Sequence, residues 1–325
     1  MKKIRQVELK DVKTVGDLLK EFSSAAFNAG RLSLALDVLE EMVSNERCTL
    51  FLGLAGAMVP AGLRYVISDM IKDGFLDVLV TTGANITHDL VEAFGGSHYK
   101  ENNSKSYELM DRGDRVRDKR IKDIKLRDEK ISRIYDSYID DESFIKLEKG
   151  IYQLLTDLPE EKRESISISD LLYEIGLRLK DERSILRQAS IRRVPVFVPA
   201  FIDSILGLHT WFFSQENEIS LNILEDISKI LDIVFESESN GVLIVGGGVP
   251  KNFILQSMLM SQKGFEFAIQ IRADRPEYGG LSGASLEEAI SWGKINKDAK
   301  IVDLVGDATI LLPILISSLR ERLNK

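Results

Sequence analysis

Cysteine is almost absent from this sequence, and its scarcity limits the chemistry open to the chain. The single cysteine, Cys48, cannot form an internal disulfide, and a zinc site built on two or more cysteine ligands is excluded. A chain without disulfides is expected in the reducing cytoplasm. Cys48 stands directly before an apolar run and is expected to be a small residue of the core.

Long uninterrupted hydrophobic runs are also lacking. The two most apolar stretches are residues 194–213, which contain Asp203 and His209, and residues 310–319, which fall short of the roughly 20 residues of a spanning helix. Residues 1–13 alternate charges where a secretion signal has an apolar segment. We therefore expect a cytoplasmic protein with no membrane partner.

Positive charge is in deficit. The 325 residues include 43 Lys and Arg but 51 Asp and Glu, which gives a net charge of −8. Such a chain has no overall positive field to attract nucleic acid or anionic lipid, whereas a polycation is a natural ligand. Apolar residues (44%) and charged residues (29%) have the proportions of a globular protein. We expect one domain over residues 1–325, with a large core.

Short apolar runs alternate with amphipathic segments along the chain. Six runs have the composition of strands buried on both faces: residues 49–54, 77–81, 194–198, 242–245, 267–271 and 301–305. Four segments have helical periodicity: residues 60–72, 169–180, 220–235 and 309–323. This alternation favours a doubly wound α/β fold, in which a mainly parallel, Rossmann-like sheet carries helices on both faces.

Two segments lie outside this alternation. Residues 1–45 repeat apolar side chains at helical spacing, which predicts a helical lead-in to the sheet. Residues 100–135 are dense in charges of both signs, as is typical of a solvated loop or a surface helix. We expect an exposed excursion there.

Small residues follow several of the predicted strands. Ligands of such sheets bind beyond the carboxyl ends of the strands, so these positions are candidates for a binding site. In residues 246–248 (GGG), backbone N–H groups could approach a phosphate or ribose, although three glycines also make a tight turn. Residues 54–57 and 82–85 follow two further strands. Asp307 follows the last strand, where it could face a ligand or act as the N-cap of the final helix.

The most unusual segment is YGGLSGASLEEAISWGK, residues 278–294. Ser285 and Glu288 have the spacing of a capping box that begins a short helix, and the glycine before the final lysine is a suitable end for it. Lys294 then lies where the helix dipole favours any cation, as it would an ordinary surface lysine. Beside the indole of Trp292 and shielded from water, however, its amine would lose a proton more easily and could form an imine.

These features together resemble the deoxyhypusine synthase family. The resemblance is carried by SWGK (residues 291–294), by Glu288 six residues before the lysine, by the triple-glycine turn and by DVLVTTGAN (residues 77–85). It extends from about residue 27 to the final helix.

The resemblance implies an enzyme that uses NAD to oxidise spermidine beside its secondary amine, captures the aminobutyl group as a lysine imine, and passes it to a lysine of a translation initiation factor. On the matching positions Lys294 is the nucleophile, Trp292 packs against the polyamine chain and Glu288 holds a cationic amine. A homotetramer with active sites at dimer interfaces is also implied. The positions expected to contact NAD are Thr82, Gly83, His88, Asp203, Gly247, Gly248, Ser282, Asp307 and Ala308.

Several matching positions depart from the usual pattern of the family. In the amine pocket, Leu208 and Leu281 stand where the synthases usually have acids, and Asn252 replaces a histidine. His88 stands where a glutamate is expected to hold the adenosine ribose, and Gly-Ala at residues 56–57 replaces a Ser-Asn pair.

The resemblance implies the reaction type but leaves alternatives for the substrate pair. The GGLSGA loop (residues 279–284) with Asn252 is similar to the archaeal and bacterial branch, some of whose members make homospermidine by using putrescine as acceptor. An inactive NAD-binding homologue is a further alternative, favoured by the missing acids but disfavoured by the retained Glu288, Trp292 and Lys294. No metal is expected in the site.

Overall fold

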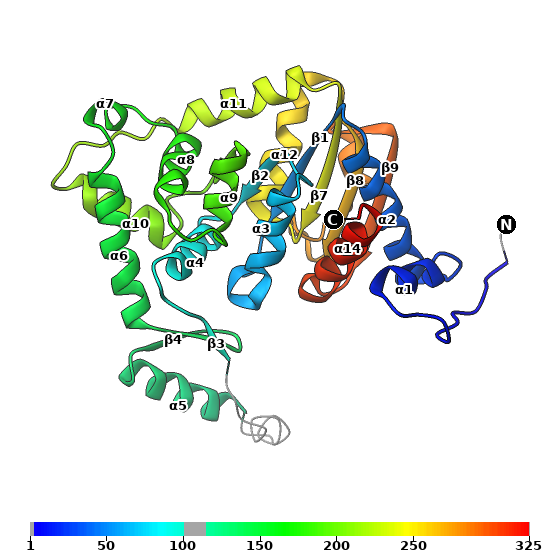
Figure 1. Cartoon of the computed structure of the whole chain (residues 1–325), viewed down its shortest axis with the longest axis horizontal. Coiled ribbons are helices and arrows are strands. Elements are labelled where there is room, and N and C mark those ends of the chain that lie inside the picture. The colour runs from blue at the N-terminus through cyan, green and yellow to red at the C-terminus, as the bar shows by residue number, and fades with distance from the viewer. Residues whose placement is uncertain (1–2, 101–114, 325) are drawn as a thin grey trace.

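A six-stranded sheet lies at the centre of the protein (Figure 1). The computed structural model describes residues 3–100 and 115–324. All neighbouring strands of this sheet pair in parallel, in the order β6-β2-β1-β7-β8-β9. The strands are β1 (Cys48–Leu54), β2 (Val78–Thr81), β6 (Val196–Phe197), β7 (Ser239–Val245), β8 (Phe265–Arg272) and β9 (Ile295–Val305).

The six predicted strands are confirmed, with differences at their ends. β7 begins at Ser239, before the apolar run, because the polar Ser239 and Asn240 still pair with β1. The prediction for residues 194–198 was too long, since only Val196 and Phe197 pair, after a proline that has no N–H to donate. Hydrogen bonding to a neighbouring strand, rather than hydrophobicity, therefore sets these ends.

Helices connect the strands. Those of the main body are α1 (Val15–Phe22), α2 (Phe27–Ser44), η1 (Val59–Leu63), α3 (Arg64–Lys72), α4 (Gly83–Ala93), α6 (Asp141–Thr156), α7 (Glu160–Arg163), α8 (Ile168–Arg178), α9 (Ile185–Arg192), α10 (Ile205–Ser214), α11 (Ile223–Glu236), α12 (Gly248–Ser261), η4 (Pro276–Tyr278), α13 (Glu288–Ser291) and α14 (Ala308–Arg322). No helix in the described ranges combines the length and the apolar character that crossing a membrane would require.

The helices cover both faces of the sheet, as predicted for a doubly wound fold. Leu52 of β1 packs in one core with residues of α2, α3 and α14, whereas Phe51, its neighbour, packs in a second core with residues of α11 and α12. Successive side chains of a strand point to opposite faces. The sheet is thus buried on both sides, which explains why its strands read as continuous apolar runs.

Five helices of the main body were not predicted: α4, α6, α7, α9 and α10. The apolar stretch at residues 194–213 contains one of them, because the chain turns after β6 and Ser204 then begins α10. The Ser204 hydroxyl accepts a hydrogen bond from the Gly207 N–H at 3.0 Å, which caps the helix.

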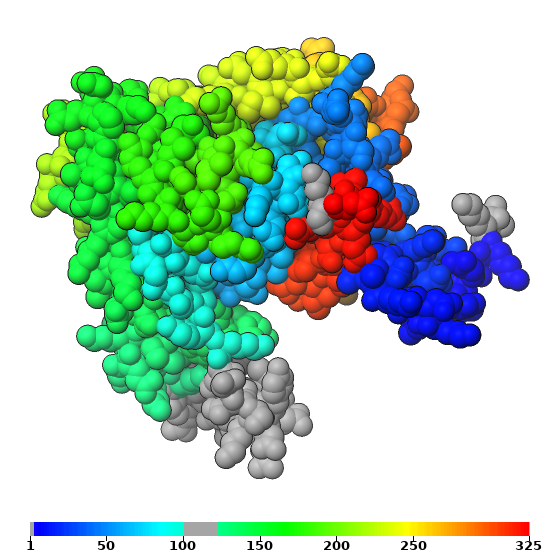
Figure 2. All heavy atoms as spheres, in the orientation of Figure 1, coloured from blue at the N-terminus to red at the C-terminus, as the bar shows by residue number. Residues whose placement is uncertain are grey.

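The helices α1 and α2 precede β1 in the chain, and α2 packs against the main sheet in the core that contains Leu52. A different segment stands away from the sheet in Figures 1 and 2. The charged excursion contains α5 (Arg115–Asp128) and a three-stranded antiparallel sheet of β3 (Tyr99–Lys100), β5 (Ser137–Asp140) and β4 (Ile131–Ile134), and it projects beyond α4 and α6. Residues 101–114 of this segment lie outside the described residues.

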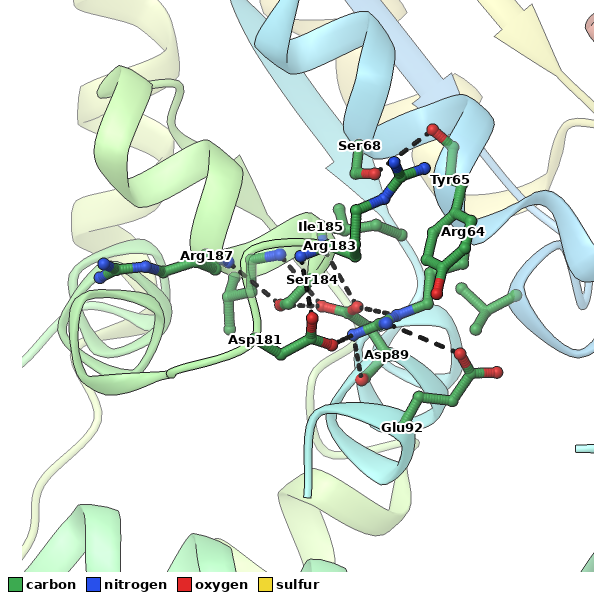
Figure 3. Close-up of polar contacts among 12 residues, drawn as sticks. Arg64, Tyr65, Ser68, Asp89, Glu92, Asp181, Arg183, Ser184, Ile185 and Arg187 are labelled. Carbon is green, nitrogen blue, oxygen red and sulfur yellow. Dashed lines mark hydrogen bonds and ion pairs between the residues drawn. The ribbon is translucent and has the colours of Figure 1, made fainter. Parts of the chain in front are cut away.

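A buried ion cluster joins α3, α4 and the start of α9 (Figure 3). Arg64 Nε donates to Asp89 Oδ1 at 2.7 Å, and Arg64 Nη2 donates to Asp181 Oδ2 at 2.6 Å. Asp89 also accepts hydrogen bonds from the Ser184 hydroxyl at 2.8 Å and the Ile185 N–H at 3.0 Å, so it caps α9. Both charged groups of the Arg64–Asp89 pair are buried, and neither has access to water if its partner is lost.

We expect Asp89→Ala to lower the free energy of unfolding by about 3–5 kcal/mol, because it leaves the Arg64 guanidinium buried without its main counter-charge. Urea denaturation followed by circular dichroism measures the loss. Glu129→Ala is the control, since it breaks an exposed ion pair with Lys125 and is expected to cost less than about 1 kcal/mol. Equal losses in the two variants would contradict a role for the cluster in anchoring α9.

Candidate active site at the carboxyl edge of the sheet

The strand order reverses direction between β1 and β7. From this pair the chain builds outward through β2 to β6 on one side and through β8 to β9 on the other. Such a switch point opens a crevice beyond the carboxyl ends of the strands. Residues 55–57 and 246–248 leave the sheet there, side by side, with the Ala55 N–H donating to the Val245 carbonyl at 2.9 Å.

Two glycine-rich loops, residues 246–248 and 279–284, meet beside this crevice. Gly247 lies so close to Ser282 that a Cβ added to the glycine would be 2.4 Å from the serine Cα. Gly248 has φ +60° and open space where a Cβ would point. Only glycine allows this close approach and this backbone conformation without strain, so the sequence requirement at the turn is steric.

The other residues expected to contact NAD also follow strand ends. Thr82 begins α4 and accepts a hydrogen bond from the Asn85 N–H at 3.4 Å. Gly83 packs against Ser204, next to Asp203, because a Cβ added at Gly83 would lie 2.5 Å from that serine's Cβ. The structure therefore brings the ends of β2 and β6 together.

Asp307 is the N-cap of α14, one of its two predicted roles. Its Oδ1 accepts hydrogen bonds from the N–H and the hydroxyl of Thr309, both at 2.8 Å, and Ala308 is the first residue of the helix. Asp203 and Asp307 follow the two outermost strands of the sheet. Six strands at about 4.8 Å spacing put these two ends roughly 24 Å apart, so only an extended ligand could reach both within one chain.

A separate pocket of about 40 Å³ contains the predicted nucleophile. Its lining residues include five of the predicted catalytic and substrate-binding residues: Asn252, Leu281, Glu288, Trp292 and Lys294. This volume accommodates one end of a polyamine but not the whole chain. Lys294 Nζ lies 5.2 Å from the centroid of the Trp292 ring, a cation–π arrangement, and 64% of Trp292 is exposed.

The prediction of a capping box at Ser285 and Glu288 was wrong. The helix α13 begins at Glu288 itself, after a turn, with Glu287 as its N-cap position. A capping box needs the serine hydroxyl to accept a hydrogen bond from a backbone N–H of the first turn, and among the described residues no side chain makes such a bond at this helix. Within residues 3–100 and 115–324, the Glu288 carboxylate has no hydrogen bond or ion pair, so it is available to a ligand. The predicted end of the helix at Gly293 (φ +69°) is correct.

Leu208 does not lie in the pocket of Lys294. It belongs to α10, after the outer strand β6, and is 48% exposed, whereas the pocket is lined by residues of α12, the loop at residues 281–285, α13 and Lys294, which directly precedes β9. The expectation that Leu208 and Leu281 line one amine pocket is thus not met within a single chain.

His88 lies in α4 and is paired inside the protein. Its Nδ1 is 2.9 Å from His98 Nε2, and His98 Nδ1 is 2.8 Å from Glu92 Oε1. Burial, reinforced by the neighbouring His98, lowers the pKa of His88 to about 4, although Glu92 acts in the opposite direction. His88 is therefore neutral at pH 7. Its contact with a cofactor stays a prediction.

One residue of the pocket was missed by the sequence analysis. Lys251 lines the pocket but is only 1% exposed, and its Nζ donates to Gln270 Oε1 at 3.0 Å and to the Leu281 and Ala284 carbonyls at 3.3 and 2.5 Å. The available signal was a lysine directly after GGGVP in a largely apolar helix. Burial lowers the pKa of this lysine to about 8.

Comparison with known proteins agrees with this geometry. The deoxyhypusine synthase family model matches residues 17–319. A probable deoxyhypusine synthase of Methanosarcina acetivorans is 47% identical over 312 residues, which cover 96% of this chain and 92% of that protein. One from Archaeoglobus fulgidus is 42% identical over 308 residues, covering 95% and 94% of the two chains.

The fold is also found among solved structures. The crystal structure of an Entamoeba histolytica protein assigned as a deoxyhypusine synthase superimposes with a TM-score of 0.64 and 18% identity, covering 97% of this chain and 96% of that one. At this identity the likeness concerns the fold alone. The family match, however, spans all six strands and the whole Lys294 pocket, and with the similarity to the archaeal proteins it shows that this chain belongs to the deoxyhypusine synthase family.

Proposed function

We propose that this protein is an NAD-dependent transferase that moves the aminobutyl group of spermidine, through an imine on Lys294, to a lysine of a translation initiation factor. Membership of the family implies a transferase. The observation that carries the finer proposal is the pocket in which Lys294 lies against Trp292 and beside the unpaired carboxylate of Glu288.

The pocket residues have separate roles in this reaction. When bound, NAD supplies the reversible hydride acceptor that makes the carbon beside the secondary amine of spermidine electrophilic. Neutral Lys294 attacks that carbon, and propane-1,3-diamine leaves, so that the aminobutyl group becomes an imine on Lys294. Attack by the acceptor lysine on the same carbon then frees Lys294 and leaves an imine on the acceptor, which the hydride held by the reduced cofactor would convert to the product amine. Trp292 packs against the polyamine chain, and Glu288 holds an ammonium group of the donor.

The carboxyl edge of the sheet suits a dinucleotide. The helices α4, α12 and α14 all begin at this edge, and α12 begins at Gly248 without a side-chain cap in the described structure, so its first N–H groups can bind a phosphate. Thr82, Gly83, Gly247 and Ser282 would lie along the cofactor. His88, Asp203, Asp307 and Ala308 are the remaining proposed contacts.

A second copy of the chain would complete the site. Leu208 and Asp203 follow the outer strand β6 and do not line the Lys294 pocket, so one chain does not surround a polyamine with all of these residues. Around them α10 exposes Ile205, Trp211 and Phe212, whose rings and aliphatic chains are 38–54% accessible to solvent. Apolar surface of this kind is typical of subunit contacts. We therefore propose a homotetramer built from dimers that share their active sites.

Multi-angle light scattering is expected to give a particle of four chains of 36.5 kDa. Trp211→Asp and Phe212→Asp together should lower this mass, because two buried carboxylates in the contact would be costly. Leu224→Asp, a change of an exposed apolar residue on α11, is the control. A monomer with full activity would contradict the shared site.

Product analysis tests the proposed function directly. The protein is incubated with NAD, labelled spermidine and either the initiation factor or putrescine, and the labelled products are identified. Label on a lysine of the factor supports deoxyhypusine synthesis. Labelled homospermidine alone identifies the putrescine-dependent reaction, and no product with either acceptor indicates an inactive homologue.

A further inference from the structure

Lys251 and Gln270 form a buried pair between the two glycine-rich loops of the site. Lys251 lies in α12, just after the turn at residues 246–248, and Gln270 lies in β8. Lys251 is 1% exposed and Gln270 is fully buried. Neither belongs to the lead-in, the excursion or the ion cluster at Asp89.

The hydrogen bonds of this pair reach both loops. Gln270 Oε1 accepts from Lys251 Nζ at 3.0 Å, while its Nε2 donates to the Gly246 carbonyl at 2.9 Å and to the Ser282 carbonyl at 3.1 Å. Lys251 Nζ also donates to the carbonyls of Leu281 and Ala284. Gln270 therefore holds the turn proposed for the cofactor. Together with Lys251 it also holds the loop that forms a wall of the amine pocket.

Burial of the Lys251 ammonium group at this position is unfavourable in free energy, which suggests that the lysine has a specific role. All three acceptors of its ammonium group are neutral oxygens, and burial of a cation without a direct counter-charge is unfavourable. An apolar side chain would fill the same space more favourably, but it could not hold two carbonyls of the loop. Lys251 also lines the pocket of Lys294 and Glu288, where a cationic donor would lie.

We propose that Lys251 and Gln270 are positioning residues that couple the cofactor turn at residues 246–248 to the amine loop at residues 279–284, so that binding at one loop orders the other. This inference rests on the proposed function for the identity of the two ligands. The pair itself does not touch the reacting atoms. Its effect is to fix the close approach of Gly247 to Ser282, which places the two ligands side by side.

The charge of Lys251 gives this coupling a pH dependence. The charged groups that face it are Arg272, Asp303, Glu288 and Lys294. Its lowered pKa, about 8, places loss of its proton between neutral and mildly alkaline pH. Below this pH its ammonium repels a polyamine, and above it the repulsion disappears while the neutral amine still has two N–H donors.

Calorimetric binding of spermidine and of NADH, which cannot oxidise the donor, separately and together, measures the coupling. In the parent we expect each ligand to raise the affinity for the other by about 5–150-fold, the usual range for coupled sites. In Lys251→Met and Gln270→Glu the factor should fall below about threefold. Lys263→Met is the matched control, since Lys263 also donates to backbone carbonyls, those of Phe235 and Ser237, but away from the site. Unchanged coupling in both pair variants overturns the proposal.

The pH profile separates positioning from a general structural role. The ratio of the spermidine dissociation constant of the parent to that of Lys251→Met should fall as pH rises from 7 to 9, because only the parent loses a repelling charge. The titration of spermidine itself is common to both proteins and cancels in the ratio. A ratio that does not change over this range contradicts the assignment to Lys251.

Hydrogen exchange of the ligand-free proteins distinguishes this proposal from the proposed function. If the parent binds neither NAD nor spermidine, the proposed function fails. Exchange of the amides at residues 279–284 then tests by itself whether Lys251 and Gln270 hold the amine loop. Faster exchange in Gln270→Glu than in Lys263→Met then supports it, and equal exchange overturns it. Gln270→Glu preserves the size of the side chain, so the proposal can still be tested with this variant if Lys251→Met does not fold.

Discussion

Lys294→Arg is expected to fold and to bind NAD like the parent but to form product at least about a thousandfold more slowly. Arginine keeps the positive charge and the contact with the Trp292 ring, 5.2 Å from the lysine nitrogen in the parent. It cannot lose its proton at any working pH, so it cannot attack the oxidised donor. Loss of a covalent nucleophile typically has effects of this size or larger.

Borohydride trapping followed by mass spectrometry checks this result. Reduction converts an imine into a stable secondary amine, so parent incubated with NAD and spermidine should carry the added mass on Lys294. Lys297→Arg is the control, because Lys297 is an exposed lysine of β9, three positions after Lys294. Label in Lys294→Arg at the parent level would sink the proposed mechanism.

Glu288→Gln is expected to weaken spermidine binding by about 10–100-fold with little change in stability. The amide preserves the shape of the side chain but removes the charge that holds an ammonium group, and hydrogen bonds to charged groups contribute about 1.5–3 kcal/mol. Stability should be almost unaffected, because among the residues that the structure describes no side chain, Glu288 included, caps this helix.

Glu287→Gln is the matched control for this variant. Glu287 is the neighbouring exposed acid, and it does not line the pocket. Isothermal titration with spermidine compares the two variants, and thermal unfolding verifies that both remain folded. Equal affinities in Glu288→Gln and the parent would show that another group reads the charge of the donor.

The fold was largely predictable because burial on both faces leaves a clear trace in sequence. Residues 49–54 and 242–245 read as unbroken apolar runs since each of their side chains faces a helix layer. The helices α4 and α10 were missed for a related reason. Polar residues in buried positions, such as Asp89 in α4, disguise the helical period, and their partners lie in distant segments.

The site was predictable only where one short segment carries it. Glu288, Trp292 and Lys294 are close in sequence and share a pocket, so the resemblance in this segment placed them together. Lys251 was missed because its importance depends on carbonyls 30 and more residues away, at Leu281 and Ala284. The Ser285–Glu288 spacing misled because spacing alone does not fix the backbone angles that a cap requires.

The order of the strands has a consequence for synthesis of the chain. β1, near the N-terminus, pairs with β2 on one side and with β7 on the other, where Cys48 lies opposite Ser239 and Leu54 opposite Val245. A growing chain that has not yet reached β7 therefore carries β1 with an unpaired, apolar edge, which can pair with another chain. Closure across so long a loop is slow. The central strand of the enzyme is thus the one most in need of protection by chaperones while the polypeptide leaves the ribosome.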